Sequence, residues 1–207
     1  MYLKIILGIV VIILTMVILL NVIQVSPFSS LSISSISHQS SFDNQEYLVL
    51  KQNNETKEEL EKTTYQLALI RSKLNSLIEE LKQDTNYLEV NFGTHAISVI
   101  NDLHFEPKHI QESTSSYTIN KKYMYLCLRQ TNNQYSDPNT LMFVAIHELA
   151  HMISAQADPT HVTQEFHSNF ENLLRFAYQQ SIWNYVDYSV APVFYCGINV
   201  DATPDIL

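Results

Sequence analysis

The sequence predicts an α+β domain with a small antiparallel sheet, placed behind an N-terminal transmembrane helix. Three observations predict it: an uncharged apolar run opens the chain, two stretches have helical periodicity, and segments rich in β-formers lie between them. The chain has 207 residues, 21 of them acidic and 12 basic, for a net charge of -9. This length allows one modest domain together with an anchor and a spacer.

The apolar run from Ile5 to Leu20 carries no charge and extends to Val25 with only two polar interruptions. About twenty such residues are enough to cross a bilayer as a helix. A cleaved signal peptide is the competing interpretation, but its apolar region is normally shorter, and the residues after Val25 form a poor cleavage site. We therefore expect residues 1–25 to be an uncleaved, single-pass anchor in a host or viral membrane. Lys4 favours a cytoplasmic N-terminus and a lumenal or external domain.

Residues 26–46 are rich in serine and are expected to form a flexible spacer, which leaves residues 47–207 for the domain. From Glu55 onward the pattern is helical, with a leucine at every seventh position: Leu60, Leu67, Leu74, Leu81 and Leu88. This spacing has two interpretations, a coiled-coil homodimer or one long helix that packs on its own domain. Thr63 and Asp84, at the interleaved positions, favour the second.

From Asn91 to Gln134 the pattern becomes that of strands. Residues 117–119 and 123–128 are rich in β-formers, and residues 120–122 between them suit a hairpin turn. In the second segment Met124, Leu126 and Leu128 share one face, which predicts a strand with a buried side.

The segment His147-Glu148-Leu149-Ala150-His151 is expected to lie on a helix that begins with Asp137 as its N-cap and Pro138 in its first turn. Histidines four residues apart project from one face of a helix, so both imidazoles can bind one metal ion. The apolar residues around them indicate a buried helix. Burying two histidines and a glutamate costs free energy unless these side chains have a binding partner. A zinc site is the better explanation.

A catalytic zinc site needs a third protein ligand and keeps one position open. His161 lies ten residues after His151, across a turn-forming stretch and just before Thr163, a plausible N-cap. Glu171 lies twenty residues after His151, within the next predicted helix. The local sequence favours His161, with Glu171 as the alternative.

The other histidines lack a metal-ligand spacing and are expected to be surface or hydrogen-bonded residues: His38, His95, His104 and His109. His167 is expected to support the site indirectly or to be exposed. Cys127 and Cys196 are either free buried thiols or a bridge formed in an oxidising compartment. One tyrosine of three late in the chain could donate its phenol to a transition-state oxyanion, although packing explains them equally well: Tyr185, Tyr188 and Tyr195.

Residues 147–151 and 161–166 together resemble the pattern H-E-L-x-H followed by H-x-x-E-F/W of the SprT-like and WLM zinc metallopeptidases. Residues 116–121, 126–129 and 194–197 resemble membrane-anchored, metallopeptidase-like proteins of large DNA viruses. The likeness covers roughly residues 45 to 204, and the metal motif is its most specific part. It implies a zincin-like fold and a strand, 123–128, that borders the cleft and pairs with extended substrate. The implied ligands are His147, His151 and His161, with Glu148 as the catalytic base.

The sequence therefore predicts a membrane-anchored zinc metallopeptidase that hydrolyses peptide bonds through a Glu-activated water. The alternative is a membrane-tethered structural or virion protein with a structural zinc site, but such a site needs no Glu148 and usually has a fourth protein ligand. Repair of DNA–protein crosslinks, a role of some SprT-like enzymes, is a third possibility. The charge of -9 and the lack of a basic run argue against any nucleic-acid partner.

Overall fold

The computed structural model describes residues 34–206 apart from 131 and 159, and this part of the chain mixes helices and strands, as the α+β prediction requires. The expected anchor, residues 1–25, and the first part of the expected spacer lie outside the described residues. Among the helices that are described, none combines the length and the apolar character needed to span a membrane.

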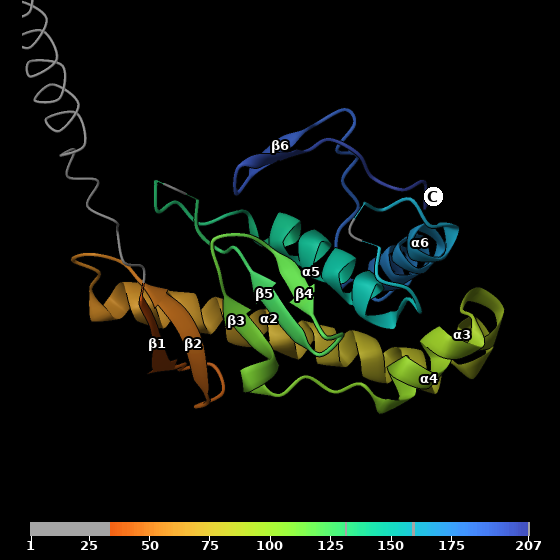
Figure 1. Ribbon diagram of the computed structural model, residues 1–207, viewed down its shortest axis with the longest axis horizontal. Coiled ribbons are helices and arrows are strands. Elements are labelled where there is room, and N and C mark those ends of the chain that lie inside the picture. Colours follow the sequence, from red (N-terminus) through yellow and green to blue (C-terminus); the bar gives the residue numbers. More distant parts are fainter. Residues whose placement is uncertain (1–33, 131, 159, 207) are drawn as a thin grey trace, which may run out of the picture. The chain divides into compact units, whose positions relative to one another are not determined.

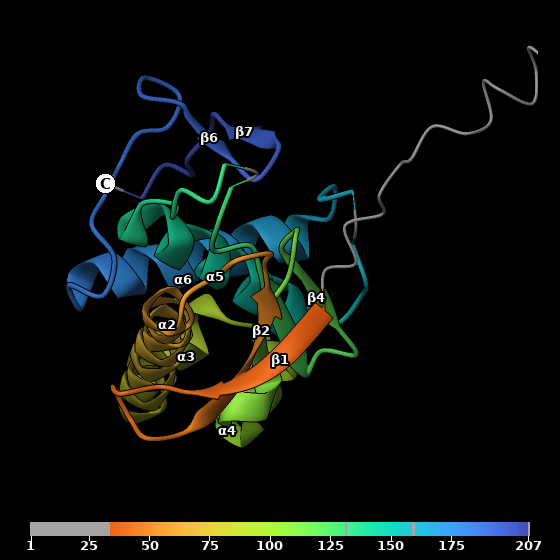
Figure 2. The ribbon, with the colours of Figure 1, turned by 90° about the vertical axis from the view of Figure 1, so that its left-hand side faces the viewer.

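The domain begins with a hairpin that the sequence did not predict. Strands β1 (Ser34–Gln39) and β2 (Glu46–Lys51) pair antiparallel, with Ile36 opposite Val49 (Figure 2). The spacer prediction is therefore wrong for residues 34–46. The serine-rich strand β1 contributes little apolar surface, but β2 brings Tyr47 and Val49, both fully buried, and supplies the backbone partners that β1 needs.

Helix α2 (Lys57–Gln83) extends for about 40 Å at 1.5 Å per residue. It starts with a capping box in which the Glu59 amide donates to the Thr56 hydroxyl and the Thr56 amide donates to the Glu59 carboxylate, at 3.2 and 2.8 Å. Figure 1 shows β1 and β2 near one end of α2, with α3 (Thr85–Asn91) and α4 (Thr94–Asp102) at the other.

The heptad leucines face the core of their own chain. Leu67, Leu74 and Leu81 are fully buried, Leu60 nearly so, and Leu88 is buried on α3. The predicted single helix through residue 88 ends at Gln83, because Asp84 caps the start of α3 through the Tyr87 amide at 2.9 Å. The leucine stripe is thus occupied by intrachain packing, the second of the two interpretations of its spacing.

Helix α4 corrects the prediction that strands begin at Asn91. Residues 94–102 fell within the stretch expected to form strands, but Ala96 and Ile100 are four residues apart and both buried, so one helical face packs on the core. Here tertiary packing outweighs the strand propensity of single residues.

The central sheet is mixed, where a small antiparallel sheet was expected. After the 3-10 turn η1 (Pro107–His109) come β3 (Ile110–Glu112), β4 (Tyr117–Ile119) and β5 (Tyr123–Leu126), in the spatial order β3-β5-β4. β3 is parallel to β5, and β4 is antiparallel to it. The predicted β4–β5 hairpin and its turn are confirmed, but the second strand ends at Leu126 and not at residue 128. The parallel pair arises because β3 and β4 form the two edges of the sheet. The chain then returns from β4 as β5 and pairs between them.

Helices α5 (Pro138–Ile153) and α6 (Gln164–Gln179) pack side by side, and the hairpin of β6 (Val193–Tyr195) and β7 (Ile198–Val200) follows. Asp137 caps α5, as expected, by accepting from the Thr140 amide at 2.9 Å. Most of α5 is buried, and aromatic rings from α6 and the segment that follows it surround Phe143.

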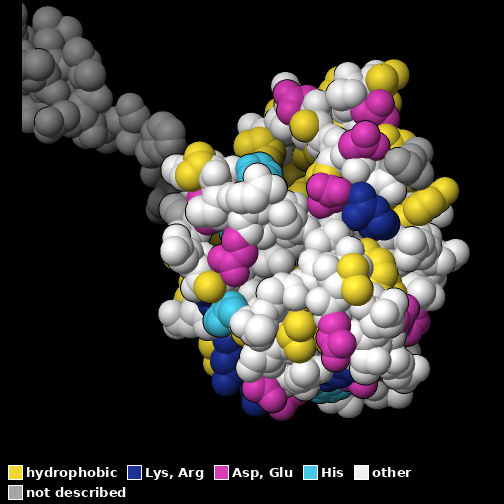
Figure 3. Space-filling model, turned by 90° about the vertical axis from the view of Figure 1, so that its right-hand side faces the viewer, with side chains coloured by type: hydrophobic (Ala, Val, Ile, Leu, Met, Phe, Trp, Pro, Cys, Tyr) yellow, Lys and Arg dark blue, Asp and Glu magenta, His cyan; other side chains and the backbone are white. Residues whose placement is uncertain are grey.

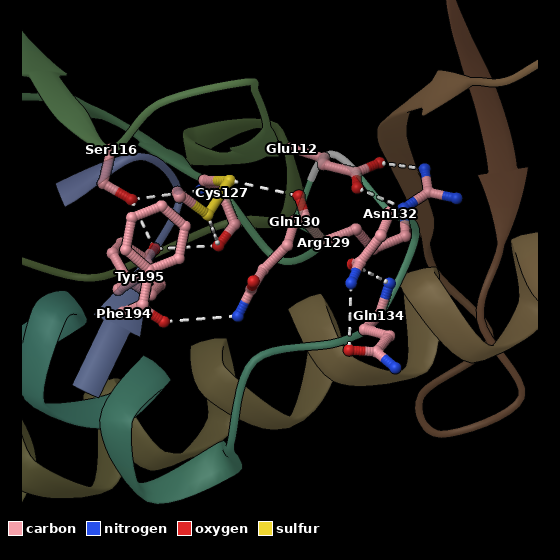
Figure 4. Close-up of a disulfide and its surroundings, with 10 residues drawn as sticks. Glu112, Ser116, Cys127, Arg129, Gln130, Asn132, Gln134, Phe194 and Tyr195 are labelled. Atoms are coloured by element: carbon pink, nitrogen blue, oxygen red, sulfur yellow. Dashed lines mark hydrogen bonds and ion pairs between the residues drawn. A yellow bond between two sulfur atoms is a disulfide. The ribbon is translucent and has the colours of Figure 1, made fainter. Parts of the chain in front are cut away.

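A disulfide between Cys127 and Cys196 joins the residue after β5 to the β6–β7 turn (Figure 4). Beside it the Tyr195 hydroxyl donates to the Cys127 carbonyl at 2.8 Å. Of the two sequence interpretations of these cysteines, the bridge is the one observed. The C-terminal hairpin is thereby attached covalently to the central sheet.

A buried charge network connects the first hairpin to the same sheet. Arg129 pairs with Glu112 through two hydrogen bonds of 2.7 and 2.8 Å, and with Glu55 (Figure 4 shows the Glu112 pair). Glu112 also accepts from the Leu50 amide of β2 at 2.8 Å. All three charged side chains are almost inaccessible, and their mutual hydrogen bonds offset the cost of burying them.

Candidate metal centre

Helix α5 presents His147 and His151 from successive turns of one face. The helix is fixed in direction because Leu149, Ala150 and Ile153 are fully buried around these positions. Both histidine side chains are half-buried, so they lie at the boundary between the core and solvent. The predicted spacing of four residues therefore brings the two rings to one site, with centroids 4.9 Å apart.

The loop after α5 returns His161 to these rings. Asp158 organises the loop, since its carboxylate accepts from the amides of Val162 and Thr163, at 3.1 and 2.8 Å, and from the Thr163 hydroxyl at 2.7 Å. His161 itself has a φ of 56°, in the left-handed region, which turns the chain sharply before α6. Thr163 caps α6, as the sequence predicted, by accepting from the Phe166 amide.

The three imidazoles converge on one point. The Nε2 atom of His161 lies 3.1 Å from Nε2 of His147 and 3.0 Å from Nε2 of His151, and all three ligand atoms lie within 4.8 Å of one another. A tetrahedral ion with Zn–N bonds of about 2.0–2.1 Å separates its nitrogen ligands by roughly 3.3 Å. The two Nε2 separations from His161 are therefore close to the spacing of two ligands on one small tetrahedral ion.

The protonation states of the α5 histidines also suit a metal. Burial and the neighbouring His151 and His161 rings lower the pKa of His147 to about 3. Burial and the His161 ring lower the pKa of His151 to about 4. Both rings are therefore neutral at pH 7 and keep the nitrogen lone pair that a metal ion requires.

Helix α6 forms an aromatic wall beside the three histidines. The Phe166 ring stacks on His151 with centroids 4.3 Å apart and meets His147 edge-on at 5.0 Å, while Phe170 meets His147 edge-on at 5.1 Å. These contacts hold two of the imidazoles in place and keep water from that side. The sequence motif of residues 161–166 includes Phe166 but does not predict its contact with the histidines, because this contact depends on how the two helices pack.

The alternative third ligand lies elsewhere. The Glu171 carboxylate pairs with Arg175 on the same helix at 2.7 Å and does not belong to the histidine cluster. His167 is exposed on α6 and also lies outside the cluster. Within the described part of the chain, no second group of three potential ligands occurs. Geometry thus favours His161 as the third ligand.

Glu148 lies next to His147 and is buried, but it is not one of the clustered ligands. The Thr118 hydroxyl of β4 donates to its Oε2 at 2.9 Å. Burial raises the pKa of Glu148 to about 7, against the lowering effect of this hydrogen bond. A carboxyl group with a pKa near neutrality can take up and release a proton at physiological pH.

Thr118 is the site residue that the sequence did not reveal. The strand expected to border the cleft was 123–128, but β5 occupies the middle of the sheet and β4 forms its edge beside α5. That expectation is wrong about the strand. The sequence of a hairpin does not show which of its two strands pairs with a third strand, and here β3 pairs with β5. Alternation along β4 turns Thr118 to one face and Tyr117 and Ile119 to the other.

The three candidate oxyanion donors differ in their surroundings. The Tyr195 hydroxyl is buried between the Cys127 carbonyl and the Ser116 hydroxyl, at 2.8 and 2.6 Å, and burial raises its pKa. Tyr188 contacts the Thr140 hydroxyl at 3.2 Å inside the core. Tyr185 is half-buried and packs edge-on against Trp183. Packing and hydrogen bonding within the fold therefore account for the positions of all three tyrosines.

The surface in Figure 3 carries dispersed acidic side chains, few basic ones and only small, separate hydrophobic patches. On this face the basic side chains do not form a continuous band (Figure 3).

Comparisons with known proteins find relatives among viral proteins. An uncharacterized protein of Acanthamoeba polyphaga mimivirus is 35% identical over 89 residues, which are 42% of this chain and 44% of the relative. One from Invertebrate iridescent virus 6 is 28% identical over 139 residues, 65% of this chain and 74% of the relative. One from Invertebrate iridescent virus 3 is 50% identical over 56 residues, 26% and 35% of the two chains.

The chain thus spans less than half the length of the mimivirus relative. No family model matches the sequence. No solved structure matches it either. The descriptions of the three relatives name no activity, so an assignment of function has to be argued from the site.

Proposed function

We propose that this chain is a zinc-dependent peptidase held at a membrane by its N-terminal segment. The observation that carries the proposal is the convergence of three imidazole nitrogens beside a buried glutamate that is not part of their cluster. His147, His151 and His161 would hold the ion. Three histidines and one open position are the ligand arrangement of catalytic zinc sites.

A bound Zn²⁺ supplies Lewis acidity, which lowers the pKa of water to about 7 and polarises a carbonyl group. Glu148 accepts a proton from the attacking water and then donates it to the amine nitrogen that leaves when the peptide bond breaks. One group must act first as a base and then as an acid, and in the metal-free site burial raises the pKa of this carboxyl group above its usual value. The stacked Phe166 ring keeps the histidines oriented during these steps.

A structural zinc site is the competing function. Such a site closes with a fourth protein ligand, whereas the cluster in the described residues has three members. A structural site also has no use for a buried carboxyl group beside one of its ligands, where burial disfavours the charged form. Both features favour catalysis.

The membrane topology is a further part of the proposal. The disulfide supports a lumenal or external domain, because such bridges persist in oxidising compartments and are rare in the cytosol. In sealed vesicles that carry the full chain, protease added on the cytoplasmic side should leave the domain intact. Digestion of the domain from that side would reverse the proposed orientation.

The decisive experiment uses the purified full chain. It should contain about one zinc ion per molecule and cleave members of a broad peptide library. Glu148→Gln should keep its zinc and its melting temperature but lose about 10² to 10⁴ in kcat, the usual contribution of base catalysis. His147→Ala, His151→Ala and His161→Ala should each lose the metal and some stability, since binding is coupled to folding.

Two matched variants on α6 serve as controls. Glu171→Gln and His167→Ala should keep both zinc and activity, because neither residue belongs to the histidine cluster. If Glu171→Gln empties the site while His161→Ala leaves it full, the third ligand is Glu171. If the wild-type protein binds zinc but cleaves no peptide in the library, the peptidase proposal is wrong and a structural zinc site is favoured.

A further inference from the structure

Strand β4 brings one hydroxyl group to the buried glutamate. Thr118 Oγ1 lies 2.9 Å from Oε2 of Glu148 and 3.3 Å from the Glu148 carbonyl oxygen. A threonine hydroxyl has one proton to donate, and the shorter contact is to the carboxylate. Bonds from a hydroxyl to a carboxylate are also the stronger kind.

We infer that Thr118 is a positioning residue, which holds the Glu148 carboxylate in the orientation needed for proton transfer. The inference rests on the proposed peptidase function and adds to it a residue from outside the metal motif. A glutamate side chain has three rotatable bonds, and rate falls steeply when a catalytic group moves by about 1 Å. A fixed donor on the opposite element therefore contributes to the rate without touching substrate.

The pairing of β4 with β5 determines which side chain meets α5. Thr118 lies opposite Met124, and Met124 is fully buried, so both side chains point to the core face of the sheet. Tyr117 and Ile119 point to the other face and are exposed, and the Tyr117 ring stacks on Tyr125 with centroids 4.7 Å apart. Thr118 is thus the member of β4 that faces Glu148.

Tethers on both sides of Thr118 fix the strand relative to α5. Before it, the Ser116 hydroxyl contacts the Tyr195 hydroxyl at 2.6 Å and accepts from the Cys127 amide at 3.0 Å (Figure 4). After it, the Lys121 ammonium group donates to the carbonyl oxygens of Ser154 and, at 2.7 Å, of Ala155, at the C-terminal end of α5. Thr118 therefore lies on a strand that is hydrogen-bonded to neighbouring elements on both sides of it.

The test compares two substitutions at this position in the zinc-loaded full chain. Thr118→Val keeps the shape of the side chain but removes the hydroxyl, and kcat should fall about 10- to 100-fold with KM within about twofold of wild type. Zinc content should be unchanged. Thr118→Ser restores the hydroxyl and should return kcat to within a few-fold of wild type. Tyr117→Phe, which removes a hydroxyl from the opposite face of the same strand, is the matched control and should have no effect.

A second measurement needs no catalysis. In the metal-free protein, the losses of melting temperature caused by Thr118→Val and by Glu148→Ala should be non-additive, because either change removes the same hydrogen bond. Additive losses would overturn the contact on which the inference stands.

The outcomes separate this inference from the proposed function. If the wild type cleaves peptides and Thr118→Val keeps full kcat, or if Thr118→Ser fails to restore it, Thr118 has no positioning role and the peptidase proposal stands. If the zinc-loaded wild type cleaves nothing, the peptidase proposal falls and the catalytic role of Thr118 falls with it, whatever the melting experiment gives.

Discussion

Asp43 joins the turn of the first hairpin to helix α2. Its carboxylate accepts from the Tyr47 hydroxyl at 2.5 Å, from the Arg71 guanidinium at 2.8 Å and from the Gln45 amide at 3.0 Å. Burial opposes ionisation of this group, but the three hydrogen bonds and the charge of Arg71 outweigh it and hold the pKa of Asp43 below its usual value. The ionised carboxylate therefore stabilises the folded state.

This shift predicts a pH dependence of stability. A carboxyl whose pKa is depressed on folding contributes stability above its unfolded pKa of about 3.9, and this contribution disappears as the pH falls through the folded value. Asp43→Asn should lower the free energy of unfolding by about 1.5–3 kcal/mol at pH 7, as for hydrogen bonds to a charged group. The difference from wild type should shrink below about pH 4, which denaturant titrations at several pH values would measure.

The exposed Asp102 at the end of α4 provides the control. Asp102→Asn should change the free energy of unfolding by less than about 0.5 kcal/mol at any of these pH values. A constant difference between wild type and Asp43→Asn from pH 7 down to pH 3 would contradict the assigned role of the Asp43 charge.

At the same scale, the sequence predicted the parts of the site that follow from local spacing. His147 and His151 meet because they are one helical turn apart, and Glu148 follows from the same motif. The sequence favoured His161 over Glu171 as the third ligand but could not decide between them. The position of His161 beside His147 and His151 depends on the loop that Asp158 organises. Thr118 was out of reach, since it meets Glu148 across 30 positions of sequence.

Among the elements, the helices with strong signals were predicted and the weakly apolar strand was missed. The cap at Asp137 and the repeat of leucines in α2 depend on local sequence and are borne out in position. Strand β1 contains mostly serine and polar residues, so its composition resembles a linker, and only its pairing with β2 makes it part of the fold. The amino-acid composition of a segment does not show which strand it will pair with.

Strand β1 gives a prediction at this scale. A soluble fragment of residues 34–207 should be more stable than one of residues 47–207, because the shorter fragment loses β1, the Asp43 network and the bond from the Ser41 amide to Glu61. Thermal unfolding of the two fragments measures the difference. Equal melting temperatures would mean that residues 34–46 do not stabilise the domain and act as a spacer.

Across the whole domain, the disulfide connects residues 69 positions apart. Closing a loop of this length restricts the unfolded chain and, in the loop-entropy account, stabilises the fold by about 4 kcal/mol. The double variant with Cys127→Ser and Cys196→Ser should therefore unfold at a lower temperature than the oxidised wild type. Reductant should lower the wild-type melting temperature and leave that of the variant unchanged. Two titratable thiols in the purified, unreduced wild type would contradict the bridge.

The same bridge closes a covalent ring around the metal-binding segment, since α5, the His161 loop and α6 all lie between Cys127 and Cys196. Residues 155–157 in this ring form a loop whose side chains are all exposed, the kind of segment that proteases cut. A single cut there would leave both pieces joined. Self-cleavage or nicking would then pass unnoticed on a non-reducing gel and appear as two fragments only after the disulfide is reduced.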